Sequence, residues 1–323
     1  MPMAGFRCLP IQAGLDRDDD VLRRLGQGAV TIWLAATLSF LALRVLPGDA
    51  IETQLAFSGA GAEVLAERRA VLGLDAPLRV QYTQFIGGLL VGELGYSLQD
   101  GQSVMLKISQ QIVPTATLAL SALVFAVFLG ISLGIAVETR VGWGVSWLAR
   151  LVTDLALSTP IYWTGTLAIY LFTVWLGILP SAGAGTANQL VLPVTALGFH
   201  TAGAIARVTA ANLREVLSAS YVRTACAKGL PGRAVLLRHI LPAALPPVIA
   251  VIALQAGFLL SGTVITESLF VRPGIGRLLL DSVLRQDYPV VQGVVVFSAV
   301  MYVALSLVAD VLYRLLDPRV TIA

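Results

Sequence analysis

The side chains that could perform acid–base or metal chemistry are few and widely spaced in this chain. Only two histidines are present, His200 inside an apolar stretch and His239 beside a basic one. Asp154 and Glu267 border apolar segments, where an ionisable group is a functional candidate by default. A lone histidine in such a place is more often packed and hydrogen-bonded than reactive. For the two acids, positions near expected helix ends favour solvation or structural pairing.

Motifs for nucleotide or zinc chemistry do not occur in the sequence. It contains neither a G-x-x-x-x-G-K-[ST] phosphate loop nor an H-E-x-x-H zinc motif. Cys8 and Cys226 have no CxxC partner and no neighbouring metal ligand, which argues against a disulfide framework. We therefore expect no catalytic residue, no bound cofactor and no metal in this chain.

The most distinctive stretch is Ser218–Pro247, a basic amphipathic segment between two long apolar runs. Its first part, SASYVRTACAKGLPG, predicts a short helix whose N-terminus is capped by Ser218 or Ser220. Gly229 suits the left-handed position beyond the helix, and Pro231 prevents its continuation. A soluble partner has its most obvious point of attachment here.

Two kinds of surface could receive this helix. Its small side chains would let it lie in a groove of another protein; they are Thr224, Ala225, Cys226 and Ala227. The same basic residues would equally favour an interfacial helix on anionic lipid. Composition alone does not separate the two.

The composition of the whole chain indicates an integral membrane protein. Of 323 residues, 57% are hydrophobic and 13% are charged, whereas soluble domains carry about 25% charged residues. Mean hydropathy is +0.82. The net charge of +3 is dispersed between apolar runs, so we expect no nucleic-acid partner.

Hydrophobic patterning predicts an all-α protein with six transmembrane helices. The expected divisions are a polar segment 1–26, a retained first helix 27–47, an acidic loop 48–114, a membrane core 115–312 and a tail 313–323. Within the core, residues 145–178 are too long for one straight span. Because Pro160 lies in the middle, we expect one kinked crossing, with two separate helices as the alternative.

Short-loop lysines and arginines predict the orientation. The loop expected between the fourth and fifth spans is rich in them; they are Arg207, Arg214, Arg223, Lys228, Arg233 and Arg238. The loop after the third span has none. We therefore expect both termini and the basic segment to be cytoplasmic, and the loop 48–114 to lie outside.

The basic segment resembles the EAA loop of ABC-importer permeases. The pattern runs from R-T-A at Arg223 through Gly229 to H-I-L-P ending at Pro242, with Arg223, Thr224 and His239 departing from the usual Glu, Ala and Ile. YVRTACAKGL and LRHILPAALPPV are similar to the form found in dipeptide and oligopeptide permeases. Further matches follow in order over about residues 25–320: RVLPGD, LGLDAPLRVQY, GELGYSL, LPSAG, RPGIGRLLLDSVLRQDYPVVQG and LDPRV.

This resemblance implies a type I ABC-importer permease fold in a bacterial cytoplasmic (inner) membrane. It implies a second, homologous permease subunit, two cytoplasmic ATPase subunits that bind ATP and Mg²⁺, and an extracytoplasmic binding protein that docks on the segment 48–114. A coupling helix at about 218–229 would transmit ATPase movements. Its expected contact residues are Tyr221, Arg223, Thr224, Ala225, Cys226, Ala227, Lys228, Gly229, Leu241 and Pro242.

The implied cargo is a di- or oligopeptide, with nickel chelates, glutathione and opines as alternatives within the same family. Candidates for the translocation path are His200, Gln255 and Ser261. Two other classes stay open. An intramembrane hydrolase would need a nucleophile and a base or metal ligands at matching depth, and a stand-alone channel would not need the short basic helix.

Overall fold

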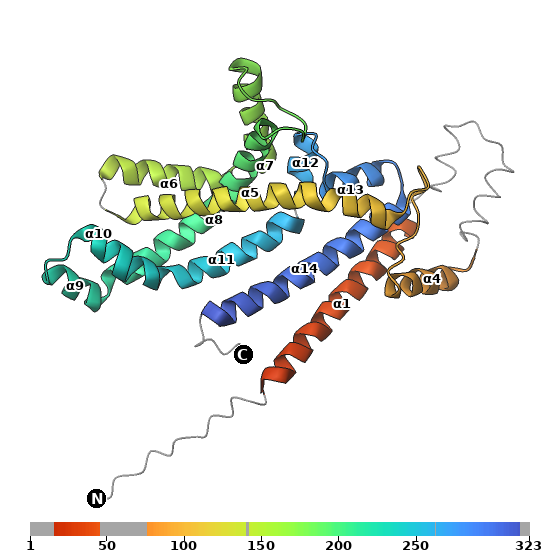
Figure 1. Cartoon of the computed structure of the whole chain (residues 1–323), viewed down its shortest axis with the longest axis horizontal. Helices are drawn as coiled ribbons and strands as arrows, with labels where there is room; N and C mark the ends of the chain where they lie inside the picture. Colours follow the sequence, from red (N-terminus) through yellow and green to blue (C-terminus); the bar gives the residue numbers. More distant parts are fainter. Residues whose placement is uncertain (1–15, 46–75, 140–141, 262, 317–323) are drawn as a thin grey trace, which may run out of the picture.

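The computed structural model describes residues 16–45, 76–139, 142–261 and 263–316, and within these ranges the protein is helical (Figure 1). The long helices are α1 (Asp16–Val45), α5 (Val104–Glu138), α8 (Asn188–Ser218), α11 (Leu241–Ser261) and α14 (Tyr288–Leu316). The shorter ones are α4 (Leu78–Leu90), α6 (Trp143–Ser158), α7 (Ile161–Ala168), α9 (Ser220–Ala227), α10 (Gly232–Val235), α12 (Val264–Leu269) and α13 (Ile275–Leu284). Two π-helical segments, η1 (Ile169–Trp175) and η2 (Leu236–Ile240), continue α7 and precede α11.

Five segments of the described chain are long and apolar enough to cross a membrane, and a bent pair of helices makes a sixth. The five are Arg23–Leu43, Val104–Glu138, Asn188–Ser218, Gly232–Leu259 and Tyr288–Val308. The prediction of an all-α protein with six apolar spans is therefore confirmed, with the third span counted as the broken pair.

The broken span bends by 113° between α6 and α7. α6 ends at Ser158, and Thr159 and Pro160 are extended, with ψ of 137° and 142°. A residue before proline avoids the helical region, and proline itself is well suited to start the next helix. The predicted interruption at Pro160 is confirmed, although the helix breaks completely and restarts instead of kinking.

Helix α8 lies at the centre of the bundle and packs against α5, α6, α7 and α11. Glycines of α5 make the closest approach: a Cβ added to Gly130 would lie 2.7 Å from the Cβ of Ile205. On Gly134 it would lie 2.5 Å from the Cβ of Thr209. Small residues at such crossings let two membrane helices approach and gain dispersion contacts, so the α5–α8 pair is the rigid frame on which the other helices are arranged.

Three helix starts differ from the sequence-based boundaries. α1 begins at Asp16 instead of residue 27, so the polar lead-in continues the first span as one helix. α5 begins at Val104 and holds Pro114 inside it, because Val104 and Ile108 are buried against α14 and extend the helix past the proline. α11 begins at Leu241, whereas the apolar run from about Pro246 to Thr263 predicts a later start for the fifth span.

The segment between the first two spans is described only from residue 76 onward. The first part of the expected loop, residues 48–75, lies outside the described residues. The next element is the helix α4, which lies on α1: the hydroxyls of Thr37 and Tyr82 are 2.8 Å apart. The ring of Phe40 stacks on Phe85 at a centroid distance of 5.6 Å.

The two ends of the bundle carry different elements (Figure 1). The beginning of α1, the end of α14 and the pair α9–α10 lie toward the left of the view. The helices α4 and α13 lie toward the right, together with the beginnings of α5 and α14. An even number of crossings, with the broken pair counted as one, places the first and last helix ends on the side of α9.

Candidate functional site

One face of α9 is fixed to the rest of the protein. Val222 and Ala225, three residues apart and therefore on one side of the helix, are 4% and 7% exposed. They join a buried cluster that includes Leu213 of α8, Val235 of α10 and Ala244 of α11. This cluster contains the ends of two spanning helices, α8 and α11. A shift of α9 would therefore displace the side chains that it packs against on both of them.

The opposite face of α9 is free in the described chain. Tyr221 is 47% exposed, and the other exposed residues on and just after the helix are Arg223, Thr224, Cys226, Ala227, Lys228 and Gly229. Among the predicted coupling residues, Ala225 is the exception, because its side chain packs inward. Leu241 is partly buried, and Pro242 is exposed where η2 continues into α11.

Of the two predicted ends of α9, the C-terminal one is confirmed and the N-terminal one is wrong. The predicted serine cap is wrong: the cap residue is Ala219 without a side-chain hydrogen bond, and the Ser218 hydroxyl donates to the Glu215 carbonyl at 2.7 Å. α8 runs up to Ser218 and leaves a single linking residue, so that serine belongs to the preceding helix. Gly229 has a φ of +75°, as predicted for the left-handed position.

The structure describes the surroundings of two of the three candidate path residues. Nε2 of His200 lies 3.0 Å from Oγ1 of Thr164, which ties α8 to α7. Gln255 is half-buried on α11. The side chain of Ser261 is outside the described part of the structure. His200 is therefore a hydrogen-bonded residue at the junction of the broken span and the central helix.

A groove that the sequence did not predict opens between α6 and α8, with α5 behind it, and several charged side chains line it. Its volume is about 280 Å³, and its charged lining residues are Arg150, Asp154, Arg207 and Arg214. The sequence-based scheme placed the last two in a cytoplasmic loop, whereas both belong to α8, which continues to Ser218. Asp154 lies inside α6 and lines the groove instead of standing at a helix end.

A spacing in the sequence could have revealed the groove. His200, Arg207 and Arg214 recur every seven residues, which places them on one face of a helix with 3.6 residues per turn. Arg150 and Asp154 share a face of α6 in the same way. That these two faces meet depends on how α6 folds back along α8, which no local pattern specifies.

Glu267 is a structural anchor at the other end of the bundle. It is 0% exposed, and its carboxylate accepts hydrogen bonds from Thr115 Oγ1 at 2.7 Å, Thr263 Oγ1 at 2.6 Å and the backbone N–H of Arg277 at 3.1 Å. Gly274 passes so close that an added Cβ would lie 2.1 Å from the carboxylate carbon. The expectation of structural pairing is thus confirmed for Glu267.

Arg272 belongs to the same buried region and is 4% exposed. Its guanidinium donates to the carbonyls of Gly183 and Gln189 at 2.9 and 3.2 Å. Burial lowers the pKa of Arg272, and the neighbouring Glu267 carboxylate opposes that shift. The two buried charges therefore hold the turn between α12 and α13 against the loop that precedes α8.

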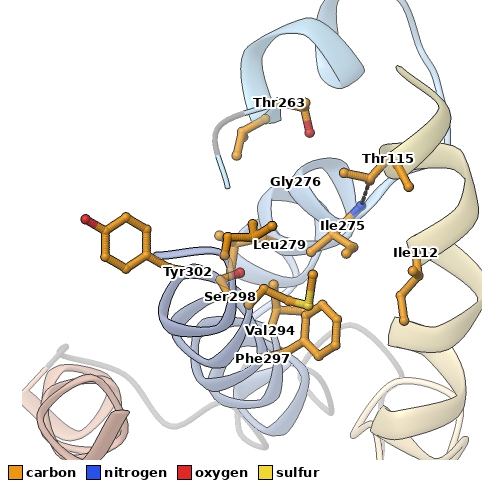
Figure 2. A pocket seen from close by; sticks show the side chains of 14 residues that line it. Ile112, Thr115, Thr263, Ile275, Gly276, Leu279, Val294, Phe297, Ser298 and Tyr302 are labelled. Carbon is orange, nitrogen blue, oxygen red and sulfur yellow. Dashed lines mark hydrogen bonds between the residues drawn. The ribbon is translucent and has the colours of Figure 1, made fainter. Parts of the chain in front are cut away.

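The pocket beside this anchor does not suit a transported solute (Figure 2). It measures about 60 Å³, and its walls are mostly apolar side chains of α5, α13 and α14. At its rim the hydroxyl of Thr115 accepts the backbone N–H of Ile275 at 2.9 Å (Figure 2). Ligand sites usually enclose roughly 300–1,000 Å³, so this space is a gap in packing.

Two of the motifs that resemble the permease family come together at the same end. Ser97 of GELGYSL donates its hydroxyl to Asp287 of RQDYP at 2.5 Å, and the backbone N–H of Leu98 donates to the same carboxylate at 3.0 Å. Lys107 donates to Ser97 Oγ and pairs with Asp100 at 2.8 Å. This polar contact fastens the loop before α5 to the beginning of α14.

The sequence contains one G-x-S-x-G pattern, at Gly130–Gly134. In α/β-hydrolases this pattern places a serine on a sharp strand-to-helix turn. Here it lies inside α5, where both glycines pack on α8 and Ser132 is exposed on the opposite side.

Among the residues that the structure describes, no three histidine, cysteine, aspartate or glutamate side chains come close enough to hold a metal ion.

Comparison with known proteins gives consistent matches along the chain. The family model described as "Binding-protein-dependent transport system inner membrane component" matches residues 126–322, and the model described as its N-terminal part matches residues 20–121. The chain is 39% identical over 303 residues to the "Glutathione transport system permease protein GsiC" of Salmonella paratyphi A, covering 93% of this chain and 98% of that protein. The protein of the same name from Escherichia coli K12 is 37% identical over the same length and coverage.

Solved structures resemble the fold at lower sequence identity. An inward-facing MetNI methionine ABC transporter matches with a TM-score of 0.57 and 16% identity, covering 66% of this chain and 97% of that one. An amino acid ABC transporter solved with histidines matches with a TM-score of 0.52 and 16% identity, covering 65% and 94%. At this identity the likeness concerns the arrangement of helices.

Proposed function

We propose a role for this chain on the premise that it belongs to the family of binding-protein-dependent transport system inner membrane components. It is a transmembrane permease subunit of an ABC importer. We propose that it forms half of a translocation pathway together with a second, homologous permease. Two ATPase subunits on the cytoplasmic side bind ATP and Mg²⁺, and an extracytoplasmic protein delivers the solute.

The observation that carries this proposal is the mounting of α9. Its buried side joins the ends of α8 and α11, and its exposed side presents Tyr221, Thr224 and Lys228, three or four residues apart. Such a helix can receive a push from a soluble partner and pass it to two spanning helices. A helix that served only as a lipid contact would need an apolar face toward the bilayer, and here the apolar face is occupied by the protein itself.

The proposed orientation places α9 and both chain ends in the cytoplasm of a bacterial cell, with α4, α13 and the polar contact of Ser97 with Asp287 outside. Arg223, Lys228, Arg233 and Arg238 lie on the α9 side, which agrees with the preference of short cytoplasmic loops for positive charge. The outer end, including the segment 48–114, would receive the binding protein.

The proposed cargo is a short peptide, with glutathione as the first candidate. Relatives at 37–39% identity over nearly the whole chain carry the name of a glutathione permease. Glutathione is itself a modified tripeptide, so this candidate lies within the expected class of di- and oligopeptides. Delivery by a separate binding protein would set most of the selectivity.

Reconstitution tests the proposal. The complete complex in lipid vesicles, supplied with the binding protein and ATP, should accumulate labelled glutathione and hydrolyse ATP faster when the loaded binding protein is present. Replacing the exposed Ala227 of α9 by Trp should abolish both the stimulated hydrolysis and uptake. The matched change Val145→Trp, at an exposed position of α6 near the same side, should leave both intact. Equal behaviour of the two variants would contradict the role of α9.

A further inference from the structure

The groove between α6 and α8 contains charged side chains that are left without a partner in the described part of the chain. Arg214 is paired, because its guanidinium lies 2.5 Å from the carboxylate of Glu138. Arg150, Asp154 and Arg207 are exposed and line the same space of about 280 Å³, and no salt bridge joins any of them to another described residue. Two guanidinium groups and one carboxylate are therefore available to a ligand.

The groove lies where a spanning helix ends. Ala149, next to Arg150, packs with Val137 of α5, and Glu138 is the last residue of that span. α5 is about 52 Å long at 1.5 Å per residue, which exceeds the hydrocarbon layer of about 30 Å. Its charged end therefore extends past the hydrocarbon, and the ion pair with Arg214 brings α8 to the same level. In the proposed orientation, this is the zone of the headgroups on the cytoplasmic side.

Helix packing closes the inner end of the groove. Gly203 of α8 lies against α6, where an added Cβ would be 2.9 Å from the Cβ of Ala156 and 3.0 Å from the Cγ of Leu157. The small side chains of Ala206 and Ala210 line the groove between the two helices. The groove is thus a short recess that ends inside the protein. Its volume is below the roughly 300–1,000 Å³ of sites that enclose a drug-sized ligand, so it suits a small headgroup whose tails stay outside.

An apolar stripe on α6 borders the charged groove. It consists of Trp147, Leu151 and Leu155, which recur every four residues, lie along one side of the helix and are exposed. Arg150 and Asp154 lie on the adjoining side and line the groove. Tryptophan is enriched at the level of lipid headgroups, and exposed leucine suits acyl chains. The groove and the stripe together present charges for a headgroup beside an apolar surface for its tails.

We propose that the groove binds a phospholipid of the cytoplasmic leaflet whose headgroup carries both a phosphate and a primary ammonium group, as phosphatidylethanolamine does. Arg150 and Arg207 donate charge-assisted hydrogen bonds to the phosphate, and Asp154 accepts hydrogen bonds from the ammonium group. The acyl chains lie along the apolar stripe of α6. This site goes beyond the proposed function, since it does not depend on which solute the complex carries.

A lipid with a purely anionic headgroup is the competing occupant, because basic pockets between membrane helices also bind such headgroups. Asp154 argues against it. Its carboxylate follows Arg150 by one turn on the same side of α6, so a phosphate held by the arginines has a like charge beside it. A headgroup with its own ammonium group offsets that charge, whereas a glycerol headgroup does not.

Photolabelling of the complete complex in detergent provides the test. The probe is a phosphatidylethanolamine with a photoreactive group near the start of one acyl chain, and its adducts are located on residues 147–155 of this chain by peptide mass spectrometry. We expect unlabelled phosphatidylethanolamine to displace the probe at a concentration about tenfold lower than phosphatidylcholine or phosphatidylglycerol with the same acyl chains. The fully methylated ammonium of phosphatidylcholine cannot donate the charge-assisted hydrogen bond to Asp154.

Variants of the exposed groove residues assign the parts of the headgroup. Asp154→Asn should remove the preference for phosphatidylethanolamine over phosphatidylcholine. Arg150→Gln and Arg207→Gln should each lower the affinity of the probe about tenfold. The control Arg23→Gln removes an exposed charge of α1 outside the groove and should leave labelling unchanged. An unchanged size-exclusion profile of each complex shows that the variant is folded and assembled.

Two results would overturn the inference. If phosphatidylglycerol displaces the probe as well as phosphatidylethanolamine does, or if Asp154→Asn keeps the preference, the site does not recognise an ammonium group. If both glutamine variants are labelled like the Arg23→Gln control, the groove does not hold the headgroup. Neither result involves glutathione uptake, so a failure of the proposed function is detected separately, in the reconstitution experiment.

Discussion

Replacing Glu267 by Ala should be among the most destabilising single changes at the outer end of the protein. The substitution removes the acceptor of two threonine hydroxyls and of the Arg277 N–H. It also leaves the buried Arg272 with only backbone carbonyls around its charge. Each buried donor that is left without an acceptor costs about 1–3 kcal/mol.

We therefore expect Glu267→Ala to lose about 3–5 kcal/mol, because the three donors relax partly toward other acceptors. Thr115→Val should cost less, since it orphans the Ile275 N–H and removes one of the three donors. Thr263→Val should cost least. The Thr263 hydroxyl donates a hydrogen bond to Glu267, and valine preserves the shape of the side chain.

The assay is thermal unfolding of the detergent-purified complex. The measured quantity is the fraction of the complex that remains monodisperse at each temperature. Glu93→Ala, at an exposed acid of the preceding loop, is the matched control. The midpoints should fall in the order wild type, Thr263→Val, Thr115→Val and Glu267→Ala, with the control unchanged. A midpoint for Glu267→Ala equal to that of the control would refute the assignment of Glu267 as an anchor.

Three further changes give separate tests. The hydrogen bond from Lys107 lowers the pKa of Asp100. The pair therefore stabilises the folded protein above the ordinary pKa of an aspartate, and this stabilisation is lost as the pH falls through the lowered pKa. In Lys107→Met, the free energy of unfolding should depend less on pH over that range. Gly130→Val should prevent stable packing of α5 on α8 and reduce membrane insertion yield, whereas Gly26→Val, where an added Cβ meets nothing within 4 Å, should not. Gly229→Ala should slow stimulated ATP hydrolysis moderately, because its φ of +75° costs a non-glycine residue about 1 kcal/mol while no neighbour blocks the Cβ.

Local chemistry was enough to predict the spans and the form of the basic helix. Runs of apolar residues mark the membrane helices, Pro160 breaks the third of them, and Gly229 ends α9 in the expected left-handed conformation. Each of these features depends on residues that are adjacent in sequence. The family resemblance also rested on local motifs, and it is confirmed by the matches along the chain.

Features that depend on long-range packing could not be predicted in the same way. Pro114 looks like a helix boundary, yet contacts of Val104 and Ile108 with α14 carry the helix through it. Arg207 and Arg214 looked like loop charges because a helix was expected to end before them. The groove needs α6 and α8 side by side, and the anchor at Glu267 needs Thr115 from a helix far earlier in the chain.

The assignment of α9 as the contact with the ATPase subunit can be tested by one crosslinking measurement. A photoreactive amino acid placed at Thr224, on the exposed face of α9, should give an adduct with the ATPase subunit in intact membranes, and the same group at Val145 should not. Adducts from Thr224 with lipid alone, or with no ATPase subunit in any nucleotide state, would contradict the account.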